Sequence, residues 1–426
     1  MLYRFAAWVY RTIADFYPQA FGDLKARRRM EATTRGNILI ACSHFWPSIG
    51  GVESRLEQFS ARLVKAGYRV TVITPAFPGR ESDTRNGVSI RSIPAGRNRF
   101  GLSVWPYCIR AAITSGEYDT CILVQDPRGV ILWTLQNLPV TVETRILVQP
   151  IITADGYERW KCDDRFTQGL AAVLQRADAA VAMTVSGPDA DFMRRQGIQP
   201  KYIPNATKPP ASQPGFRERH AIAADAFMIV HAANLWWYKN HIGLLDALPD
   251  LPSDVKLVMI GNPTAESDCV EAVTTRLAER REILYLAGCN RDDVSSAMAE
   301  TDLVVLSSLG EGSPNTILEA MSHAKPWLAT PDCGGASDNA GGLICRLSDF
   351  GEYVDILRHH ADIRRALAQL GYRHWQACFA WETVVPRWID LIEGRPLASF
   401  GMPPDIAEEL DQLRSRIEAL RFRPSG

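Results

Sequence analysis

Two glutamates flank a predicted helix start in LGEGSPNTILEAM, residues 309–321. Glu311 and Glu319 stand on either side of seven residues, with Ser313 and Pro314 between them. Serine is favoured at the N-cap of a helix and proline at its first position, so we expect Ser313 to cap a helix over about residues 315–324. The free N–H groups of such a helix start bind anions, phosphate above all. The stretch therefore predicts an anion site with a carboxylate on each side.

This arrangement fits a nucleotide-sugar. A carboxylate accepts hydrogen bonds from sugar hydroxyls, so one acid would hold a hexose and the other a ribose, with the diphosphate between them. The apolar run DLVVLSS just before the loop predicts a buried strand. In doubly wound sheets ligands bind at the carboxyl ends of such strands, which favours a site here. The alternative is that Glu311 is a solvated loop residue and Glu319 a surface helix residue.

Two further stretches indicate the same ligand. Lys239, in NLWWYKNHIGLL, stands just before a predicted helix, where an ammonium group can meet phosphate. Gly50 and Gly51, in PSIGGVE, follow the first predicted strand and would let the backbone approach a ligand at a helix start. Each signal is weak alone, but together they predict three sites that face one cleft between two sheets.

The elements that must position these residues alternate between short apolar runs and amphipathic segments. Before the proline-rich stretch 201–215 the predicted strands are NILIACS, YRVTVITP, GVSIRSIP, TCILVQ, RILVQP and AAVAMTVS. After it they are FMIVHAANL, KLVMIGN, EILYLAG, DLVVLSS, KPWLAT and GLICR. Such alternation predicts parallel sheets covered on both faces, so we expect an α/β protein of two doubly wound domains joined by a linker at 201–215.

Bulk properties exclude several classes of protein. A chain of 426 residues is long enough for two domains, and 46% apolar and 22% charged residues are typical of a globular protein. The formal net charge of −1 gives no electrostatic reason to expect a nucleic-acid partner. The nine cysteines show neither a C-x-x-C pair nor zinc-ligand spacing. No run of about 18 apolar residues is present. We therefore expect a cytoplasmic protein.

Both ends of the sequence carry amphipathic patterns with two interpretations each. MLYRFAAWVYRTIADF has an apolar stripe followed by basic residues at 25–29, so residues 1–30 would either bind an anionic membrane surface or dock on protein. In the first case the protein would lie at the inner face of the membrane. The amphipathic helix predicted in PPDIAEELDQLRSRIEALRFRPSG, residues 403–426, would either form a homodimer or cap the second domain. FAWETVVPRWIDLIEG predicts a helix interrupted or kinked at Pro386.

These stretches resemble the retaining glycosyltransferases of family four, which have the GT-B fold of two Rossmann-like domains with the donor site between them. The resemblance covers about residues 36–393 and is most specific in GEGSPNTILEAMSHAKPWLAT and GGVESRLEQFSARLVKAGYRVTVIT. Weaker family blocks are YKNH, YIPNAT, VSGPDADFMRRQGI and LAGCNRDDVSSAMAETDLVVLSS, and FAWETVVPRW resembles the helix that returns to the first domain. The resemblance implies transfer of a sugar from a nucleotide-sugar to a glycan, a lipid-linked sugar or another glycoconjugate.

The family roles carry over where positions match. Glu311 and Lys239 would be catalytic, Glu311 by holding the donor sugar near its reacting carbon and Lys239 by neutralising the leaving phosphate. Glu319 would bind the ribose, and the base would lie near Gly288 and Cys289. No metal or other cofactor is implied. The implied contacts to the rest of the donor come from Gly50, Gly51, Asn234, Gly312, Ser313, Pro314, Asn315 and Thr316.

The sequence departs from the family pattern at three positions. Asn234 stands where an arginine is usual, and a neutral amide holds phosphate less strongly. Gln125, followed by Asp126, and Gln149 stand where many members have histidines, and glutamine cannot titrate. Gln125, Asp126 and Gln149 would lie on the acceptor side. The departures leave open a non-catalytic nucleotide-sugar-binding or assembly subunit, and another GT-B chemistry such as epimerisation.

The resemblance and the alternation together predict five segments. They are an N-terminal extension at 1–35, a first Rossmann-like domain at 36–205, a second Rossmann-like donor domain at 206–372, a returning helix at 373–393 and a helical tail at 394–426.

Overall fold

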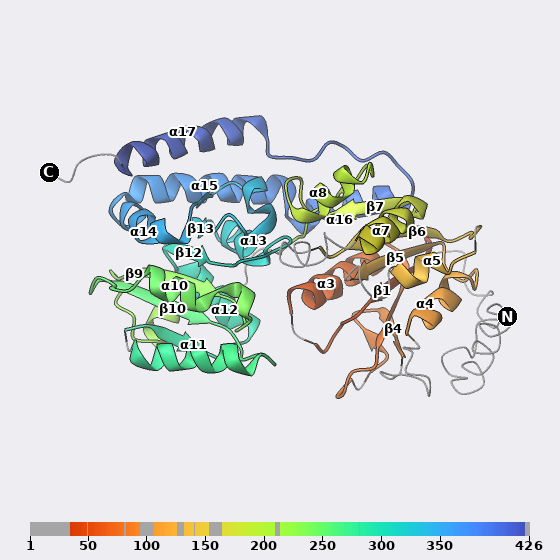
Figure 1. Cartoon of the computed structure of the whole chain (residues 1–426), viewed down its shortest axis with the longest axis horizontal. Helices are drawn as coiled ribbons and strands as arrows, with labels where there is room; N and C mark the ends of the chain where they lie inside the picture. Colours follow the sequence, from red (N-terminus) through yellow and green to blue (C-terminus); the bar gives the residue numbers. More distant parts are fainter. Residues whose placement is uncertain are drawn as a thin grey trace.

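Two parallel sheets, each covered by helices, form two domains that lie side by side (Figure 1). The protein is represented by a computed structural model. It describes residues 35–48, 50–80, 82–93, 105–125, 132–139, 141–152, 164–208, 214–280 and 282–421. The predicted amphipathic segment at 1–30 and Asp126 lie outside the described residues, as does the side chain of Gln125.

The first sheet has eight strands in the order β3-β4-β2-β1-β5-β6-β7-β8. Its strands are β1 (Asn37–Cys42), β2 (Arg69–Pro75), β3 (Thr84–Arg85), β4 (Val88–Ile93), β5 (Thr120–Gln125), β6 (Arg145–Pro150), β7 (Ala179–Ala182) and β8 (Lys201–Tyr202). Neighbouring strands run parallel except β3 and β4. The order reverses direction at β1 and β5, which places the ligand crevice of this domain above their carboxyl ends.

Helices cover both faces of the first sheet. They are α3 (Gly51–Lys65), α4 (Trp105–Ile113), α5 (Leu132–Gln136), α7 (Asp164–Arg176) and α8 (Pro188–Arg195). Side chains of β1 alternate between two apolar clusters, with Leu39 in one and Ile38 and Ile40 in the other. Burial on both faces explains why the strand reads as a continuous apolar run.

The second sheet has six strands, all parallel, in the order β11-β10-β9-β12-β13-β14. They are β9 (Phe227–Ala232), β10 (Val255–Ile260), β11 (Leu284–Leu286), β12 (Leu303–Leu306), β13 (Trp327–Ala329) and β14 (Gly342–Ile344). The helices around it are α9 (Phe216–Arg219), α10 (His241–Ala247), α11 (Ser267–Glu279), α12 (Arg291–Glu300), α13 (Asn315–Ser322), α14 (Phe350–His359) and α15 (Ala361–Cys378). The α/β class and both doubly wound sheets predicted from the sequence are confirmed.

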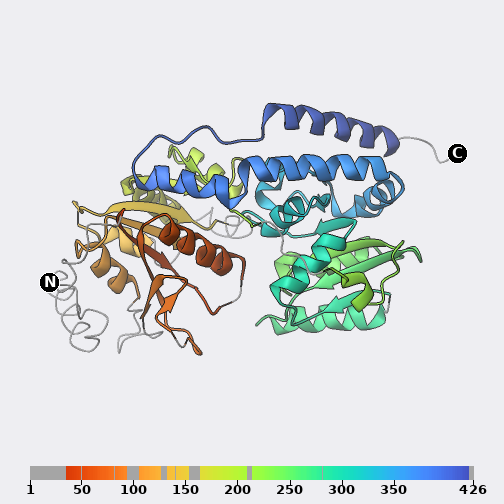
Figure 2. The same cartoon turned by 180° about the vertical axis from the view of Figure 1, so that it is seen from behind.

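Helix α16 (Trp381–Ile392) returns to the first domain, which can be followed in Figure 2. Trp381, Val384 and Trp388 are buried in the same cluster as β1 and α3. The helix is continuous across Pro386, so of the predicted interruption or kink the interruption is wrong, and the kink stays a prediction. Packing of its apolar face against the first domain offsets the hydrogen bond that the proline lacks.

The last helix, α17 (Pro404–Arg421), lies along α15 in Figures 1 and 2. Ile406, Leu410 and Ile417 are buried in the core of the second domain. Of the two interpretations of this helix, the structure therefore shows the capping one, and its apolar stripe is not exposed to a second copy of the chain.

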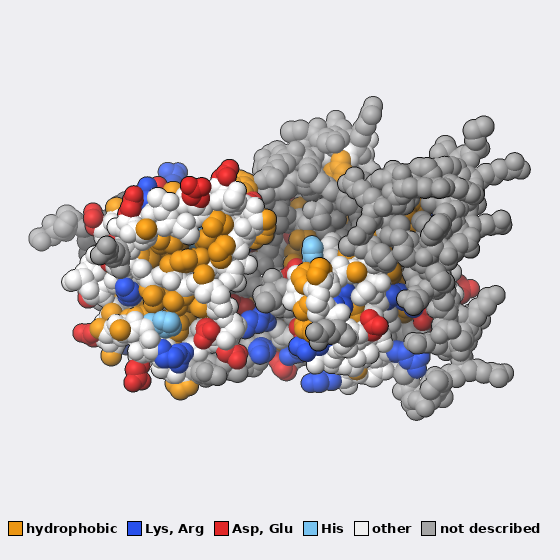
Figure 3. All heavy atoms as spheres, turned by 90° about the horizontal axis from the view of Figure 1, so that it is seen from below, with side chains coloured by type: hydrophobic (Ala, Val, Ile, Leu, Met, Phe, Trp, Pro, Cys, Tyr) orange, Lys and Arg blue, Asp and Glu red, His pale blue; other side chains and the backbone are white. Residues whose placement is uncertain are grey.

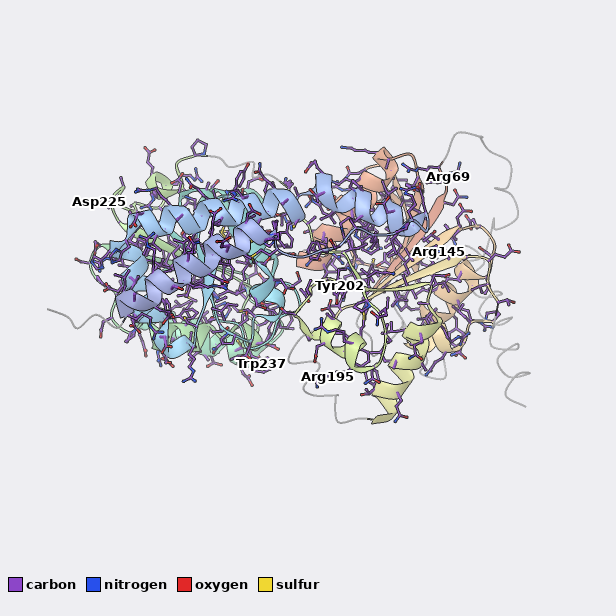
Figure 4. All side chains as sticks on the ribbon, turned by 90° about the horizontal axis from the view of Figure 1, so that it is seen from above. Arg69, Arg145, Arg195, Tyr202, Asp225 and Trp237 are labelled. Atoms are coloured by element: carbon purple, nitrogen blue, oxygen red, sulfur yellow. The ribbon has the colours of Figure 1, made fainter. Side chains whose placement is uncertain are left out.

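The predicted linker at 201–215 begins inside the first sheet, because its first two residues form β8. Further along it, Thr207 makes an isolated bridge to Ala380, just before α16, so the two passages of the chain between the domains lie together. Figure 4 shows Tyr202 and Arg195 beside the domain boundary, whereas Arg69 and Arg145 lie far from it. The exact domain limits stay a prediction.

Described side chains of both charges lie on the face of the molecule in Figure 3. Among the described side chains on the face in Figure 3, acidic and basic groups both occur along the rim. No helix in the described part of the chain is long and apolar enough to cross a membrane.

Candidate active site

A cavity of about 640 Å³ lies between the two domains. The start of α3 lines it from the first domain. The second domain contributes the loop after β9, the start of α12, and the loop between β12 and α13. Most residues predicted to bind the donor lie in its wall, namely Gly50, Gly51, Asn234, Lys239, Glu311, Gly312, Ser313, Pro314, Asn315, Thr316 and Glu319. Residues from three separate stretches of sequence therefore meet at one cavity.

The start of α13 faces this cavity without a side-chain cap. Pro314, not Ser313, is the N-cap residue, and no side chain accepts a hydrogen bond from the first turn. The predicted capping by Ser313 is wrong because the helix begins at Asn315, which moves the N-cap one residue along the chain. Helix α3 also starts without a side-chain cap, at Gly50. Two helix N-termini thus leave N–H groups for a ligand.

The two helix starts contact each other across the domain boundary. Asn315 donates a hydrogen bond from Nδ2 to the carbonyl oxygen of Gly51 at 3.3 Å. Asn205 donates from Nδ2 to the carbonyl of Ser313 at 3.2 Å and to Oδ1 of Asn315 at 3.1 Å. A Cβ on Gly51 would lie 2.9 Å from Nδ2 of Asn315, so only glycine permits this approach without a shift of the amide.

Lys239 and Glu311 form an ion pair in the cavity wall. Lys239 closes a short 3-10 helix (Trp237–Lys239), and its Nζ donates a hydrogen bond to Oε1 of Glu311. Ser308 donates from Oγ to the same oxygen at 2.8 Å. The side chains of Lys239 and Glu311 are only 17% and 11% exposed. Burial opposes the charge of Lys239, but the adjacent carboxylate outweighs it and raises the pKa of the ammonium group.

Glu319 lies further along α13 in the same wall and is half-buried. Burial raises the pKa of its carboxyl group, an effect that Arg291 partly opposes. Ser295 and His323 line the same region, with 3.2 Å between Ser295 Oγ and His323 Nε2. A carboxylate in such a half-buried wall can accept hydrogen bonds from a hydroxylated ligand.

The positions that depart from the family pattern have different environments. Asn234 accepts a hydrogen bond at Oδ1 from the backbone of Asn262 at 3.0 Å, which fixes the loop after β10. Gln149 is fully buried and does not line the cavity; its Oε1 accepts from Nη1 of Arg55 at 2.7 Å. Cys289 lines the cavity and Gly288 does not, although Asn262 accepts from the backbone of Gly288 at 2.7 Å.

Several wall residues were missed by sequence reasoning. Arg55, Gln58, Asn205, Arg291 and His323 all line the cavity. For Arg55 a signal existed, since it stands four residues after Gly51 and four-residue spacing places both on one face of a helix. The described residues contain no group of three or more His, Cys, Asp or Glu side chains that could hold a metal ion.

Two family models match the chain, one for each domain. The model described as Glycosyltransferase Family 4 matches residues 49–210, and the model described as Glycosyl transferases group 1 matches residues 226–361. The first match contains the start of α3, and the second contains Lys239, Glu311 and Glu319.

Individual proteins agree with these matches. The chain is 25% identical over 386 residues to the D-inositol 3-phosphate glycosyltransferase of Xylanimonas cellulosilytica. The match covers 80% of this chain and 91% of that protein. It is 26% identical over 171 residues to EpsD of Bacillus subtilis, where the match spans 38% of this chain and 44% of EpsD. The crystal structure of Anabaena HepE in complex with UDP-glucose is similar with a TM-score of 0.68 at 15% identity, covering 84% of this chain and 100% of that one. The chain therefore belongs to the glycosyltransferases of family 4, also described as glycosyl transferases group 1, which are retaining nucleotide-sugar-dependent glycosyltransferases of the GT-B fold.

Proposed function

We propose that the protein transfers a hexose from a UDP-sugar to a hydroxyl group of a glycan, a lipid-linked sugar or another glycoconjugate. The observation that carries this is the meeting of two uncapped helix N-termini with the Lys239–Glu311 pair in one cavity. UDP is the first nucleotide to test because HepE, which has the same fold, was crystallised with UDP-glucose.

In this proposal the diphosphate of the donor lies between the starts of α3 and α13. Negative charge grows on the leaving oxygen as the glycosidic bond breaks, and N–H groups that already point at that position stabilise it without rearranging. Lys239 adds a positive charge at the same place. These groups would neutralise the leaving diphosphate without a metal ion.

Glu311 would accept hydrogen bonds from hydroxyls of the donor sugar, and Glu319 would accept them from the hydroxyls of the ribose. Lys239 is hydrogen-bonded to Glu311, so a bound donor would insert between the two charges or share them. The acceptor hydroxyl would attack from the face that the diphosphate leaves, and its proton would pass to the departing phosphate oxygen. Front-face attack gives retention of configuration.

The first experiment is a thermal-shift screen of the full chain against UDP-, GDP-, ADP- and TDP-sugars. A ligand at about a hundred times its dissociation constant stabilises by roughly 2.7 kcal/mol. We expect a shift with UDP-sugars that Glu319→Ala removes. A shift of equal size in the variant would remove Glu319 from the donor site, and no shift with any nucleotide would contradict the proposal.

A second candidate is a nucleotide-sugar-binding subunit without turnover. It is favoured by one observation: Glu311 engages Lys239, the ammonium group on which the first proposal relies. Release of UDP from a UDP-sugar, with water or a glycan as acceptor, separates the two. Binding without UDP release under any acceptor would favour the subunit.

We further propose that residues 1–30, which lie outside the described residues, bring the enzyme to an anionic membrane surface. Removal of these residues should abolish binding to vesicles of anionic lipid and leave the UDP-sugar shift intact. Unchanged vesicle binding by the truncated chain would exclude this role.

A further inference from the structure

Arg55 is a buried cation in the first-domain wall of the cavity. It lies on α3, one turn after Gly51, and its side chain is directed toward the start of that helix because Cα–Cβ bonds tilt toward the N-terminus. Only 7% of the residue is exposed, yet it lines the cavity. A guanidinium group at this position thus has its charge removed from water and adjoins the space where substrates would bind.

The hydrogen bonds of Arg55 are incomplete. Nη1 donates to Oε1 of Gln149 at 2.7 Å, whereas Nη2 has no hydrogen-bond partner. The amide nitrogen of Gln149 has none either, although this residue is fully buried. Nη2 of Arg55 and the amide nitrogen of Gln149 are therefore both unsatisfied, although their two side chains are joined by a hydrogen bond. Buried donors without a partner are uncommon in folded proteins.

The charge of Arg55 is also uncompensated. Among the described residues no carboxylate lies within ion-pair distance of it, in contrast to Lys239, which has Glu311. Burial lowers the pKa of Arg55 to about 10, so it stays charged at neutral pH. The nearby Cys42 supplies no negative charge, because burial raises the pKa of its thiol to about 12.

We propose that Arg55, held in place by Gln149, forms an anion subsite at the first-domain wall of the cavity, which binds a phosphate or carboxylate group of one of the two substrates. Such a group supplies the missing counter-charge to Arg55, which a neutral hydroxyl does not do, whereas Gln149 does not line the cavity and only holds the guanidinium through Oε1. The group belongs either to the diphosphate of the donor or to an anionic acceptor. The choice between these substrates rests on the proposed function, whereas the anion subsite itself is testable without a sugar.

The test uses the full chain and inorganic phosphate as the probe. Thermal unfolding is followed while phosphate replaces chloride at constant ionic strength, for the wild type, Arg55→Gln and Gln149→Glu. The wild type should show a saturable rise in Tm, and both variants should lose at least half of it. Phosphate bound only at the helix N-termini would persist in the variants, so an equal rise in all three proteins overturns the proposal.

Gln149→Glu keeps the test decisive if Arg55→Gln does not fold. It places a carboxylate on Nη1 of Arg55 and so neutralises the subsite from within. We expect the phosphate-free Tm of this variant to equal or exceed that of the wild type. If Gln149→Glu had a lower Tm than the wild type and still showed the wild-type rise with phosphate, Arg55 would have only a structural role beside Gln149. The proposal would then be wrong.

Repeating the titration with saturating UDP identifies the source of the anion. If UDP abolishes the Arg55-dependent rise, the subsite takes the diphosphate of the donor; if the rise persists, it takes a group of the acceptor. If the rise in Tm with phosphate depends on Arg55 but the protein binds no UDP, the subsite is supported and the proposed UDP-sugar donor is refuted. UDP binding without that response would refute the subsite alone.

Discussion

Lys239 and Glu311 stand 72 residues apart in the sequence and form a hydrogen-bonded ion pair in the wall of the cavity. One lies after β9 and the other after β12, and these two strands are neighbours in the second sheet. Neighbouring parallel strands bring their carboxyl ends to one edge, so the fold itself sets the distance between the two charges.

Breaking this pair should reduce both stability and activity. Lys239→Gln leaves the Glu311 carboxylate buried without its partner, for which we expect a loss of roughly 3–5 kcal/mol in the free energy of unfolding. Sugar transfer should fall about 10²- to 10³-fold, as when one preorganised donor to developing charge is removed. Urea unfolding and initial rates measure these effects.

A surface ion pair provides the matched control for this variant. Arg416 and Asp362 form a bond of 2.8 Å, but each side chain is 58% exposed. Arg416→Gln should therefore change the unfolding free energy by less than about 1 kcal/mol and leave the rate unchanged. Equal losses in both variants would show that Lys239 has no special place in the site.

Glu319→Gln should weaken nucleotide binding while the free protein stays as stable as the wild type or gains stability at pH 7. Burial raises the pKa of this carboxyl group in the folded state. The folded state thus holds its proton more tightly than the unfolded state, and stability falls as pH rises through the unfolded pKa. Glutamine carries no proton to lose, so Glu319→Gln avoids this loss of stability at pH values above the unfolded pKa of Glu319. Calorimetry with UDP and Tm at pH 7 test both parts, and a large drop in Tm would contradict the second.

Gly334→Ala should displace the loop that carries Glu311. Gly334 has a φ of +56°, and a Cβ there would lie 2.4 Å from the carbonyl oxygen of Glu311 and 2.5 Å from that of Gly312. The carbonyl oxygen of Gly312 accepts a hydrogen bond from the backbone N–H of Gly335, and the N–H of Glu311 donates to the carbonyl oxygen of Asp332, both at 3.1 Å. These bonds hold the two loops together. We expect a loss of roughly 1–3 kcal/mol and a lower transfer rate.

Gly401→Ala is the control for this substitution, because nothing lies within 4 Å of a Cβ at Gly401. It should change the unfolding free energy by less than about 0.5 kcal/mol. If Gly334→Ala behaves in the same way, the loop must be able to move without loss of function.

Acid should destabilise the protein through its buried histidines, of which His374 is the clearest. It is 1% exposed, and its Nδ1 accepts a hydrogen bond from the backbone of Ala340 at 3.0 Å. Burial lowers its pKa from 6.5 to about 4. The unfolded state binds more protons between these values, so stability is present above pH 6.5 and is lost as pH falls toward 4.

The measurement is Tm at pH 7 and pH 5 for the wild type and for His374→Asn, whose amide oxygen replaces the Nδ1 acceptor. The titration of His374 contributes at most about 2 kcal/mol between these pH values. The variant should be less stable at pH 7 but should lose less on acidification. An identical pH dependence in both proteins would show that other groups account for the acid sensitivity.

The sequence was sufficient for the two sheets and for the loops at their carboxyl ends. Apolar runs that alternate with amphipathic segments predict parallel strands well, because both faces of each such strand are buried. The sequence was insufficient at single positions, where a shift of one residue changes which residue caps a helix. Ser313 and Pro314 both suit a helix start, and only the structure shows that Pro314 is the N-cap.

Arg55 was missed for a different reason. Its spacing from Gly51 was visible, but arginine on an amphipathic helix is usually exposed. Its guanidinium is hydrogen-bonded to Gln149, 94 residues away on β6, and spacing along one helix does not reveal such a contact. The capping role of α17 likewise depends on tertiary packing, because an apolar stripe does not specify what covers it.

The return of α16 to the first domain sets an order of events during synthesis. The cluster that contains β1 and α3 also contains Trp381, Trp388 and Ile392. Domains generally fold as units during synthesis, starting from the N-terminus. Here the ribosome must first complete the whole second sheet before the residues that finish the first core exist. The first domain therefore leaves the ribosome with part of its apolar surface uncovered, and the later half of the chain covers it.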